Sequence, residues 1–499
     1  MTAETLVQLP PELLYHILSF LDSRDLVRIR KTCKKLKGIV DDSDMLQYII
    51  DLGYFQMNPM GSSEVDVPPA MRRERLRLYD AARQHIEFRL KHTLSLPMSG
   101  LGRVDAFGGG IYGSAGENCI HFARLPPDVS DSGDLSYSHR WNHPVDTTNL
   151  VNFTFCAVQD LLIVVAHSPD LRSHAYEIHL KSLTTNDTHP DAAQPLLKAL
   201  DKHDIDHQIL NTKGCVKVQI IRNYVSMLSW AVIANVDDTL YSIQMWDWKS
   251  KKGYQFNLFF RYDISDYSFI TEDKFLVFVA SGSMEIYSID DKSKLPQRTA
   301  TISLPSLVDD FSYTDVFISE HPTPSSTFPD FRQSHQQPSC SFHPSADDRL
   351  IVILVWVTRT NTDHSLYYRF VVRRSAILEF ESLSVRTYNQ ILSSIFRLPW
   401  SMWGPQHTSW FRVQLNEDWH TSLFGFRTVE SINELSPHHL AEGPRRLYVR
   451  DFNPHIAWNY GAVDKSRWRG KIVPGVMDRT TSYPFTEPLG HALTYREDS

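Results

Sequence analysis

The pattern of apolar residues divides the chain into two parts of different character. In the first fifty residues, apolar side chains recur with the period of an α-helix, as in the series Leu13, Leu14, Ile17, Leu18 and Leu21. From about residue 100 onward, short β-branched and aromatic runs alternate with turn residues, and long helical periods nearly vanish. The pattern predicts a small all-α unit followed by a large all-β domain, in an α+β multidomain chain.

Three short amphipathic helices are predicted in the first fifty residues. Pro10 and Pro11 suit a helix start, where a missing N–H group costs nothing. Asp22 and Ser43 are the predicted N-caps of the second and third helices, and the second continues its period as far as Val40. A unit of this size buries little surface alone, so we expect its exposed apolar face to be a docking surface.

The motifs in this segment resemble an F-box, a helical module that binds the Skp adaptor of cullin-based ubiquitin ligases. They are the opening Leu9-Pro10-Pro11-Glu12-Leu13, then Asp25-Leu26, then Cys33-Lys34-Lys35-Leu36, in that order. The resemblance implies an adaptor between two proteins, with no reaction of its own. It also implies a set of adaptor-binding residues: Leu9, Pro10, Leu13, Leu14, Ile17, Leu18, Leu21, Leu26 and Leu36.

The predicted domain boundaries follow the changes in pattern. We place the F-box at 5–50, a linker at 51–99, the β domain at 100–485 and a poorly anchored tail at 486–499. Within the linker, residues 57–69 are rich in turn residues and predict a loop, whereas residues 70–91 predict one helix. A rigid helix of that length spans roughly 30 Å and would hold the F-box apart from the β domain.

Weak internal repetition and size favour a β-propeller for the second part. The run starting at Phe153 matches the run starting at Tyr267, and a strand follows each at Glu177 and Glu285. A third candidate strand surrounds Gln244 and carries the dipeptide Trp246-Asp247, which is similar to that of WD-repeat blades. We predict a degenerate WD-like propeller of about six to eight blades. Two β-sandwiches or a kelch-like propeller are the alternatives, although the paired glycines of kelch repeats are absent.

Composition and motifs argue against several functions. The formal net charge of −7 argues against general nucleic-acid binding, and the five scattered cysteines form no CxxC pair. The glycine-rich run 107–113 lacks a phosphate-binding pattern and predicts a turn. The histidines are interpreted as surface residues of polar connections, so we expect no metal and no cofactor. No apolar run is long enough to span a membrane, and a cytoplasmic or nuclear location, or both, is expected.

The expected function is that of a substrate receptor in a Skp–cullin–F-box ubiquitin ligase, acting in ubiquitin-dependent protein degradation without catalysing a reaction. The β domain would hold an unknown target protein. Its candidate contacts are Trp403 and Trp410, in an aromatic cluster, and the polar insertion 321–348, interpreted as a long loop between blades. The alternatives are a scaffold that acts with the adaptor outside any ligase, and an enzyme hidden in the β domain.

Overall fold

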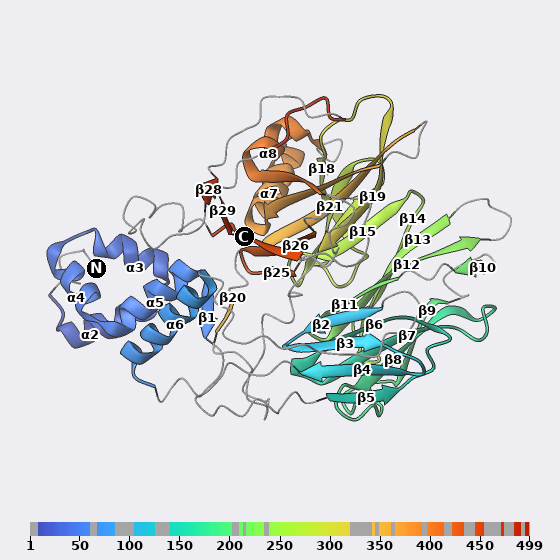
Figure 1. Cartoon of the computed structure of the whole chain (residues 1–499), viewed down its shortest axis with the longest axis horizontal. Coiled ribbons are helices and arrows are strands. Elements are labelled where there is room, and N and C mark those ends of the chain that lie inside the picture. Colours follow the sequence, from blue (N-terminus) through green and yellow to red (C-terminus); the bar gives the residue numbers. More distant parts are fainter. Residues whose placement is uncertain are drawn as a thin grey trace.

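The fold is described from a computed structural model of the chain. The residues that it describes are 8–59, 67–84, 104–124, 140–201, 209–212, 216–233, 239–319, 342–344, 349–360, 365–391, 397–413, 422–433, 445–453, 471–473, 484–490 and 495–498. In Figure 1 the N-terminal helices lie at one end of the molecule, and the sheets of the β domain are arranged around one another at the other end.

The N-terminal unit contains four short helices that pack around one core. They are α2 (Pro11–Leu18), α3 (Ser23–Arg30), α4 (Lys34–Asp42) and α5 (Asp44–Phe55). The core is made of Leu14, Leu18, Leu26, Leu36, Ile39, Val40 and Leu46, all buried. The predicted caps are confirmed, because the Asp22 carboxylate accepts a hydrogen bond from the Asp25 backbone N–H at 2.8 Å and the Ser43 hydroxyl accepts one from Leu46 at 3.4 Å.

The predicted second helix is in fact two helices. Between α3 and α4 the backbone of Cys33 is extended, with φ −155° and ψ 161°, and Cys33 serves as the N-cap of α4. The apolar period across residues 26–40 is real, because both helices turn leucine and isoleucine toward the same core. A turn between two helices can preserve such a period, and the prediction of one continuous helix was therefore wrong.

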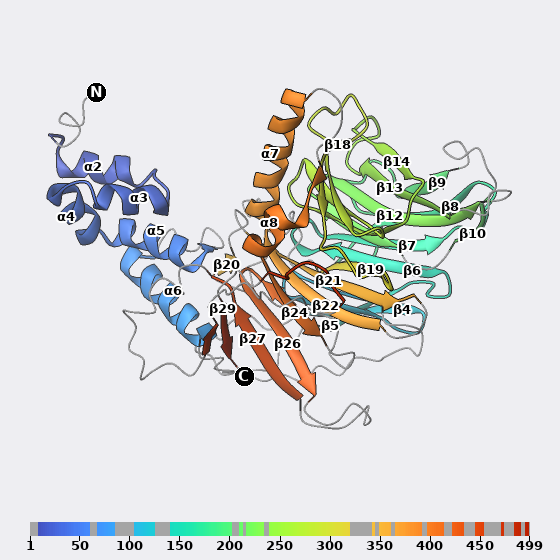
Figure 2. The ribbon, with the colours of Figure 1, turned by 90° about the horizontal axis from the view of Figure 1, so that it is seen from above.

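The linker helix packs against the N-terminal helical unit. It is α6 (Pro69–Gln84), and residues 85–91 of the predicted range lie outside the described residues. Arg73 and Arg77 of α6 both bond to the Asp51 carboxylate of α5, at 2.8 and 3.0 Å. Figure 2 shows the two helices side by side. Because Asp80 of the same helix lies 3.7 Å from Arg427 of the β domain, α6 contacts both parts of the chain, and its role as a spacer stays a prediction.

The β domain contains six sheets in the described part of the chain, antiparallel except for one short parallel pair, and five of them include a meander of four strands. Blade 1 is β2 (Asp105–Gly108), β3 (Ile111–Ala115), β4 (Cys119–Arg124) and β5 (Arg140–Pro144). Blade 2 is β6 (Leu150–Cys156), β7 (Leu161–His167), β8 (His174–Ser182) and β9 (Leu196–Asp201), with the short helix η2 (Ala157–Gln159) between β6 and β7. Blade 3 is β11 (Lys217–Ile221), β12 (Tyr224–Ile233), β13 (Thr239–Asp247) and β14 (Phe256–Phe260), and β10 (Ile209–Thr212) also pairs with β12.

Blades 4 and 5 carry the additions that distinguish this domain. Blade 4 is β15 (Ile264–Phe269), β16 (Lys274–Val279), β17 (Ser283–Ser288) and β18 (Gln297–Ser303), with β23 (Arg397–Leu398) parallel to β18. Blade 5 is β19 (Phe311–Ser319), β21 (Leu350–Arg359), β22 (Ser365–Arg373) and β24 (Thr408–Val413). The sixth sheet has β25 (Ser422–Phe424), β26 (Arg427–Asn433), β27 (Arg445–Asp451), β29 (Tyr495–Asp498) and β28 (Lys471–Val473), in that order.

The blades pack face to face, which is the arrangement of a β-propeller. One apolar cluster joins Phe122 of blade 1 to Phe153 and Leu162 of blade 2, and another joins Ile243 of blade 3 to Phe275 of blade 4. The first strands of neighbouring blades also lie side by side, as β2 with β6, β6 with β11 and β15 with β19. The propeller prediction is confirmed, with five meanders and one further sheet in the described residues where about six to eight blades were expected.

The repeats detected in the sequence correspond to equivalent strands. The runs at Phe153 and Tyr267 lie in β6 and β15, which are the first strands of blades 2 and 4. Glu177, Gln244 and Glu285 lie in β8, β13 and β17, which are the third strands of three successive blades. The glycine-rich run forms the predicted turn, because Gly109 and Gly110 connect β2 to β3 with φ values of 57° and 73°.

Two helices interrupt the β domain, in contrast to the sequence prediction. They are α7 (Arg374–Ile391) and α8 (Trp400–His407), and both lie in the connection between β22 and β24. In Figure 2, α7 stands beside the sheets. It buries Ala376, Ile377 and Phe380, and the Glu381 carboxylate bonds to Lys274 of blade 4 at 2.8 Å. Because these apolar residues directly follow the buried strand β22, their helical period is difficult to recognise in the sequence.

The predicted tail 486–499 is part of the β domain. Leu489 is buried, and the backbone carbonyl of Pro488 accepts a hydrogen bond from the indole of Trp400 at 2.9 Å. Strand β29 lies between β27 and β28, so the last described residues are held from both sides. The expectation of a poorly anchored tail is therefore wrong, because long-range strand pairing anchors residues that have little local sequence signal.

Candidate functional site

Helix α2 presents two apolar faces with different environments. Leu14 and Leu18 are 0% and 1% exposed and build the core of the helical unit. Leu13 and Ile17 lie one position earlier in each turn and are 51% and 41% exposed. Because adjacent positions of a helix point in different directions, one helix can both stabilise its own domain and offer an apolar surface.

The exposed apolar residues follow one another along α2. Pro10 precedes the helix, Leu13 and Ile17 are spaced four apart, and Phe20 follows with 76% of its surface exposed. The ring of His16 packs edge-on against Phe20, with 5.0 Å between centroids. A row of exposed large apolar residues on so small a unit is typical of a surface that a partner protein covers. We call Pro10, Leu13, Ile17 and Phe20 the docking row.

The structure divides the predicted adaptor-binding residues into two groups. Leu14, Leu18, Leu26 and Leu36 are core residues, and Leu9 and Leu21 are partly buried against them. Only Pro10, Leu13 and Ile17 of the predicted set are exposed. We interpret the buried leucines as positioning residues that hold α2 in place. Phe20 was missed because it lies just beyond the end of α2, outside its helical period.

The helical unit is joined to the β domain by a two-stranded sheet. Strand β1 (Met57–Pro59) follows α5 and pairs with β20 (Phe342–Pro344), which comes from the connection between β19 and β21 of blade 5. The Phe342 side chain is 1% exposed and packs with Tyr48, Met57 and Leu76. Both the predicted loop 57–69 and the predicted insertion 321–348 therefore contain a strand. Their remaining residues lie largely outside the described part of the chain.

Polar contacts strengthen this junction. Arg427 of β26 bonds to Asp451 and lies 3.7 Å from the carboxylate of Asp80 on α6, and all three side chains are buried. The Asn453 amide donates a hydrogen bond to the backbone carbonyl of Tyr54 at 3.1 Å. An ionic network and a shared sheet together restrict rotation between the two parts, so the docking row has a defined position relative to the propeller.

Replacing Phe342 by alanine should loosen this junction. The ring fills the space between α6 and β1, and removing a buried phenylalanine costs about 3–5 kcal/mol. Because the loss is local, we expect faster amide hydrogen exchange in α5, α6 and β1 and little change in the blades. Leu78→Ala, which changes a 55% exposed leucine on α6, is the control. Equal exchange in both variants would show that the cluster does not hold the junction.

The two tryptophans proposed as target contacts are core residues. Trp403 and Trp410 are 0% and 2% exposed. The Trp403 indole N–H donates to the Ser303 carbonyl at 2.9 Å, and the Trp410 ring stacks on Phe370 with 4.6 Å between centroids. A buried side chain cannot touch a partner on the surface, so this assignment was wrong.

Blade 1 places a cysteine beside a histidine. The sulfur of Cys119 lies 3.1 Å from Nε2 of His121, but burial raises the pKa of the Cys119 thiol, which disfavours the thiolate that a nucleophile requires. No group of histidine, cysteine or carboxylate side chains in the described segments could hold a metal ion. Among the helices that the structure describes, none is long and apolar enough to cross a membrane.

Comparison with known protein families identifies a domain in the part of the chain that contains the docking row. Residues 6–48 match the F-box-like family model, and this range contains the whole docking row. A comparison with curated proteins found no match. The chain therefore carries an F-box-like domain, followed by a β-propeller.

A search of solved structures found matches that include two WD40 domains. The WD40 domain of SCAP from fission yeast matches with 10% identity and a TM-score of 0.28, over 68% of this chain and 70% of that one. The C-terminal WD40 domain of Sif2 matches with 10% identity and a TM-score of 0.25, over 56% of this chain and 84% of that one. The β-propeller assignment rests on the strand order of the sheets and on the packing between blades.

Proposed function

We propose that the chain is a substrate receptor of a Skp–cullin–F-box ubiquitin ligase. The observation that carries this proposal is the docking row, an exposed apolar row on α2 within the residues that match the F-box-like model. F-box domains bind the Skp adaptor, so this row is the expected contact. The propeller supplies broad loop-bearing faces for a target protein, because loops on a rigid scaffold carry most binding sites.

The proposed mechanism is proximity without chemistry by this chain. The adaptor would connect the F-box to a cullin, whose other subunits bring the activated ubiquitin. A target held by the propeller would then meet that ubiquitin at a raised effective concentration. The junction at Phe342 and Arg427 supports this role, because a fixed geometry between adaptor and target keeps target lysines within reach. The complex would act in the cytoplasm, the nucleus or both.

The double variant Leu13→Ala and Ile17→Ala should lose adaptor binding. Truncating one buried interface anchor costs at least about 2 kcal/mol, so two such losses should weaken binding by roughly a thousandfold. Both side chains are about half exposed and lie outside the core of the helical unit, so the variant should keep its fold, which circular dichroism can confirm. Titration with purified Skp adaptor is the measurement, and Leu78→Ala on α6 is the control. Unchanged adaptor binding by the folded double variant would refute the proposal.

A second measurement separates the ligase from a scaffold. A receptor should co-purify with cullin as well as with the adaptor, and the cullin should disappear when Leu13 and Ile17 are both replaced. Adaptor without cullin would instead favour the scaffold that acts outside any ligase. Because both roles use the same docking row, only the cullin distinguishes them.

A further inference from the structure

The helical unit carries a dense group of basic residues close to the docking row. The segment 24–37 contains seven lysines and arginines but only one acidic residue, whereas the whole chain has a formal net charge of −7. All seven basic residues are exposed. Four of them lie between the end of α3 and the first turn of α4, and we call these four the lysine surface: Lys31, Lys34, Lys35 and Lys37.

Helix stability accounts for the arginines of this segment but not for the lysines. Arg28 and Arg30 lie in the last turn of α3, where positive charge interacts favourably with the helix dipole, and each pairs with an aspartate. Lys34 and Lys35 lie in the first turn of α4, where positive charge is unfavourable and no acidic residue offsets it. Residues that break a local rule of stability are expected at functional sites.

The lysine surface borders the helix that carries the docking row. Lys35 and Lys37 flank Leu36, whose side chain packs in the same core as Leu14 and Leu18 of α2. Helices α2 and α4 are in contact, and Figures 1 and 2 both show them as neighbours. A partner that covers the docking row therefore meets the lysines as soon as its contact extends beyond α2.

The docking row is too small to form a stable interface by itself. A specific protein–protein interface takes about 800 Å² and roughly 20–30 residues from each partner. The docking row has four residues, and α2 has only eight. The adaptor must therefore also cover the neighbouring helices, and the surface that these offer is cationic. Complementary charge on the partner favours correct orientation and rapid association.

We propose that the lysine surface is the electrostatic part of the adaptor contact, and that the adaptor places a carboxylate-rich surface against it. The docking row supplies the apolar anchors, and the lysines accelerate the encounter and orient the adaptor, because charges at the rim of an interface act mainly on the association rate. The inference rests on the proposed function, since it names the chemistry of the adaptor surface that this chain recognises.

The test measures the association rate of the full chain with purified adaptor at low and at high salt. The double variant Lys34→Glu and Lys37→Glu should associate at least about tenfold more slowly at low salt and should lose most of the salt dependence of the wild type. The variant with arginine at both positions keeps the charge and should associate as the wild type does.

A structural role for the lysines predicts the opposite change in stability. Glutamate at position 34 would place a negative charge in the first turn of α4, where it interacts favourably with the helix dipole. The glutamate variant should therefore unfold at a temperature no lower than the wild type and still associate more slowly. A lower unfolding temperature that accounts for the slower association would overturn the proposal.

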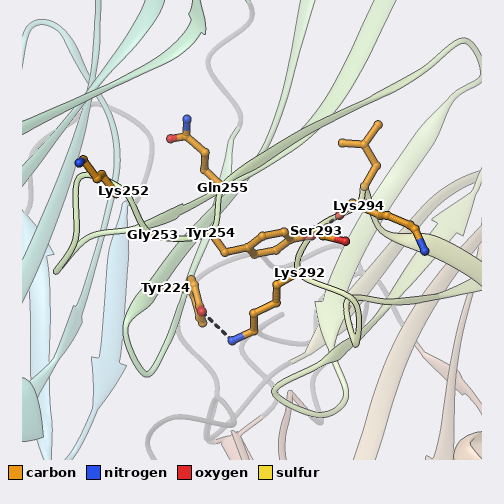
Figure 3. Close-up of a pocket in the computed structure, with 9 residues that line it drawn as sticks. Tyr224, Lys252, Gly253, Tyr254, Gln255, Lys292, Ser293 and Lys294 are labelled. Atoms are coloured by element: carbon orange, nitrogen blue, oxygen red, sulfur yellow. Dashed lines mark hydrogen bonds between the residues drawn. The ribbon is translucent and has the colours of Figure 1, made fainter.

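Lys252→Glu and Lys294→Glu together are the matched control, because they change the net charge equally at two exposed lysines. Figure 3 shows both among the residues that line a pocket between the connecting loops of blades 3 and 4. In Figure 1, β13 and β14, which precede and follow the loop of Lys252, lie at the opposite end of the molecule from α2. This control should associate with the adaptor at the wild-type rate.

Three results would overturn the proposal. They are an unchanged association rate in Lys34→Glu and Lys37→Glu, equal slowing in the control, and duplex DNA binding that this variant loses while adaptor association stays intact. The double variant Leu13→Ala and Ile17→Ala keeps the two proposals distinct. If it loses the adaptor while the lysine variant associates normally, the docking row stands and only the lysine surface fails. A wild type that does not bind the adaptor would overturn both proposals.

Discussion

Trp403→Ala should destabilise the β domain by about 3–5 kcal/mol, the usual cost of removing a fully buried tryptophan side chain. The ring packs edge-on against Trp400, with 5.0 Å between centroids, and also against Phe380. The substitution would leave a cavity where α8 meets blade 4, and the carbonyl of Ser303 would lose its indole donor. We therefore expect a large decrease in the denaturant concentration that unfolds the domain.

Met402→Ala is the matched control for this prediction. Met402 is the preceding residue of the same helix and is 57% exposed, so its truncation should change stability by less than about 0.5 kcal/mol. Denaturant unfolding of the full chain, followed by tryptophan fluorescence and by circular dichroism, measures both variants. If Trp403→Ala were as stable as Met402→Ala and yet captured fewer targets, the side chain would have to be accessible, contrary to its burial here.

Residue type alone did not decide whether Trp403 and Trp410 lie in the core or on a binding surface. Tryptophan is enriched both in cores and in binding surfaces, so a cluster near proline and glycine fits either. Whether these tryptophans are buried depends on the packing of α8, whose residues contact Ser303 and Pro488, far away in the sequence. Contacts of such long range have no local pattern. Gly404 belongs to the same packing, because a Cβ there would meet the Trp400 ring at 2.1 Å.

Features with a strong local period were predictable. The blade strands are short runs of buried residues bounded by turns, and the repeat between β6 and β15 identified equivalent positions without any contact information. The caps at Asp22 and Ser43 were also predictable, because each side chain bonds to a backbone N–H only three residues later. The junction between β1 and β20 was not predictable. Only three residues of each segment pair, the two segments are far apart in the sequence, and neither is apolar throughout.

The docking row was only partly predictable for a related reason. The motif identified α2 as the contact helix, but its leucines serve two purposes, and the period alone does not assign each face. The fold decides, because α3, α4 and α5 cover Leu14 and Leu18 and leave Leu13 and Ile17 exposed. Phe20 lies just beyond the helix end, where a helical period gives no guidance.

A buried carboxylate connects three successive blades of the propeller. Asp266 lies in β15, the first strand of blade 4, and is 4% exposed. Its Oδ2 atom accepts a hydrogen bond from the Lys217 ammonium of β11 at 2.9 Å and another from the backbone N–H of Ile318 in β19 at 2.7 Å. Blades 3, 4 and 5 therefore meet at one side chain.

Asp266→Ala should consequently destabilise the β domain by about 3 kcal/mol. Removing one partner of a buried ion pair costs about 3–5 kcal/mol, because the remaining charge loses its main electrostatic interaction. Lys217 keeps 26% of its side chain exposed, so water recovers part of this cost and the lower value applies. The N–H of Ile318 would also lose its acceptor. Asp263→Ala, at an exposed position just before β15, is the control and should be nearly neutral.

A double-mutant cycle with Lys217→Met tests whether the ion pair itself is responsible. If it is, Asp266→Ala should cost less in the Lys217→Met background than in the wild type, because the ammonium that pairs with Asp266 is absent there. Denaturant unfolding of the four proteins measures this coupling. Equal costs in both backgrounds would assign the effect to the Ile318 hydrogen bond, and a cost no larger than that of Asp263→Ala would show that the blades do not depend on this carboxylate.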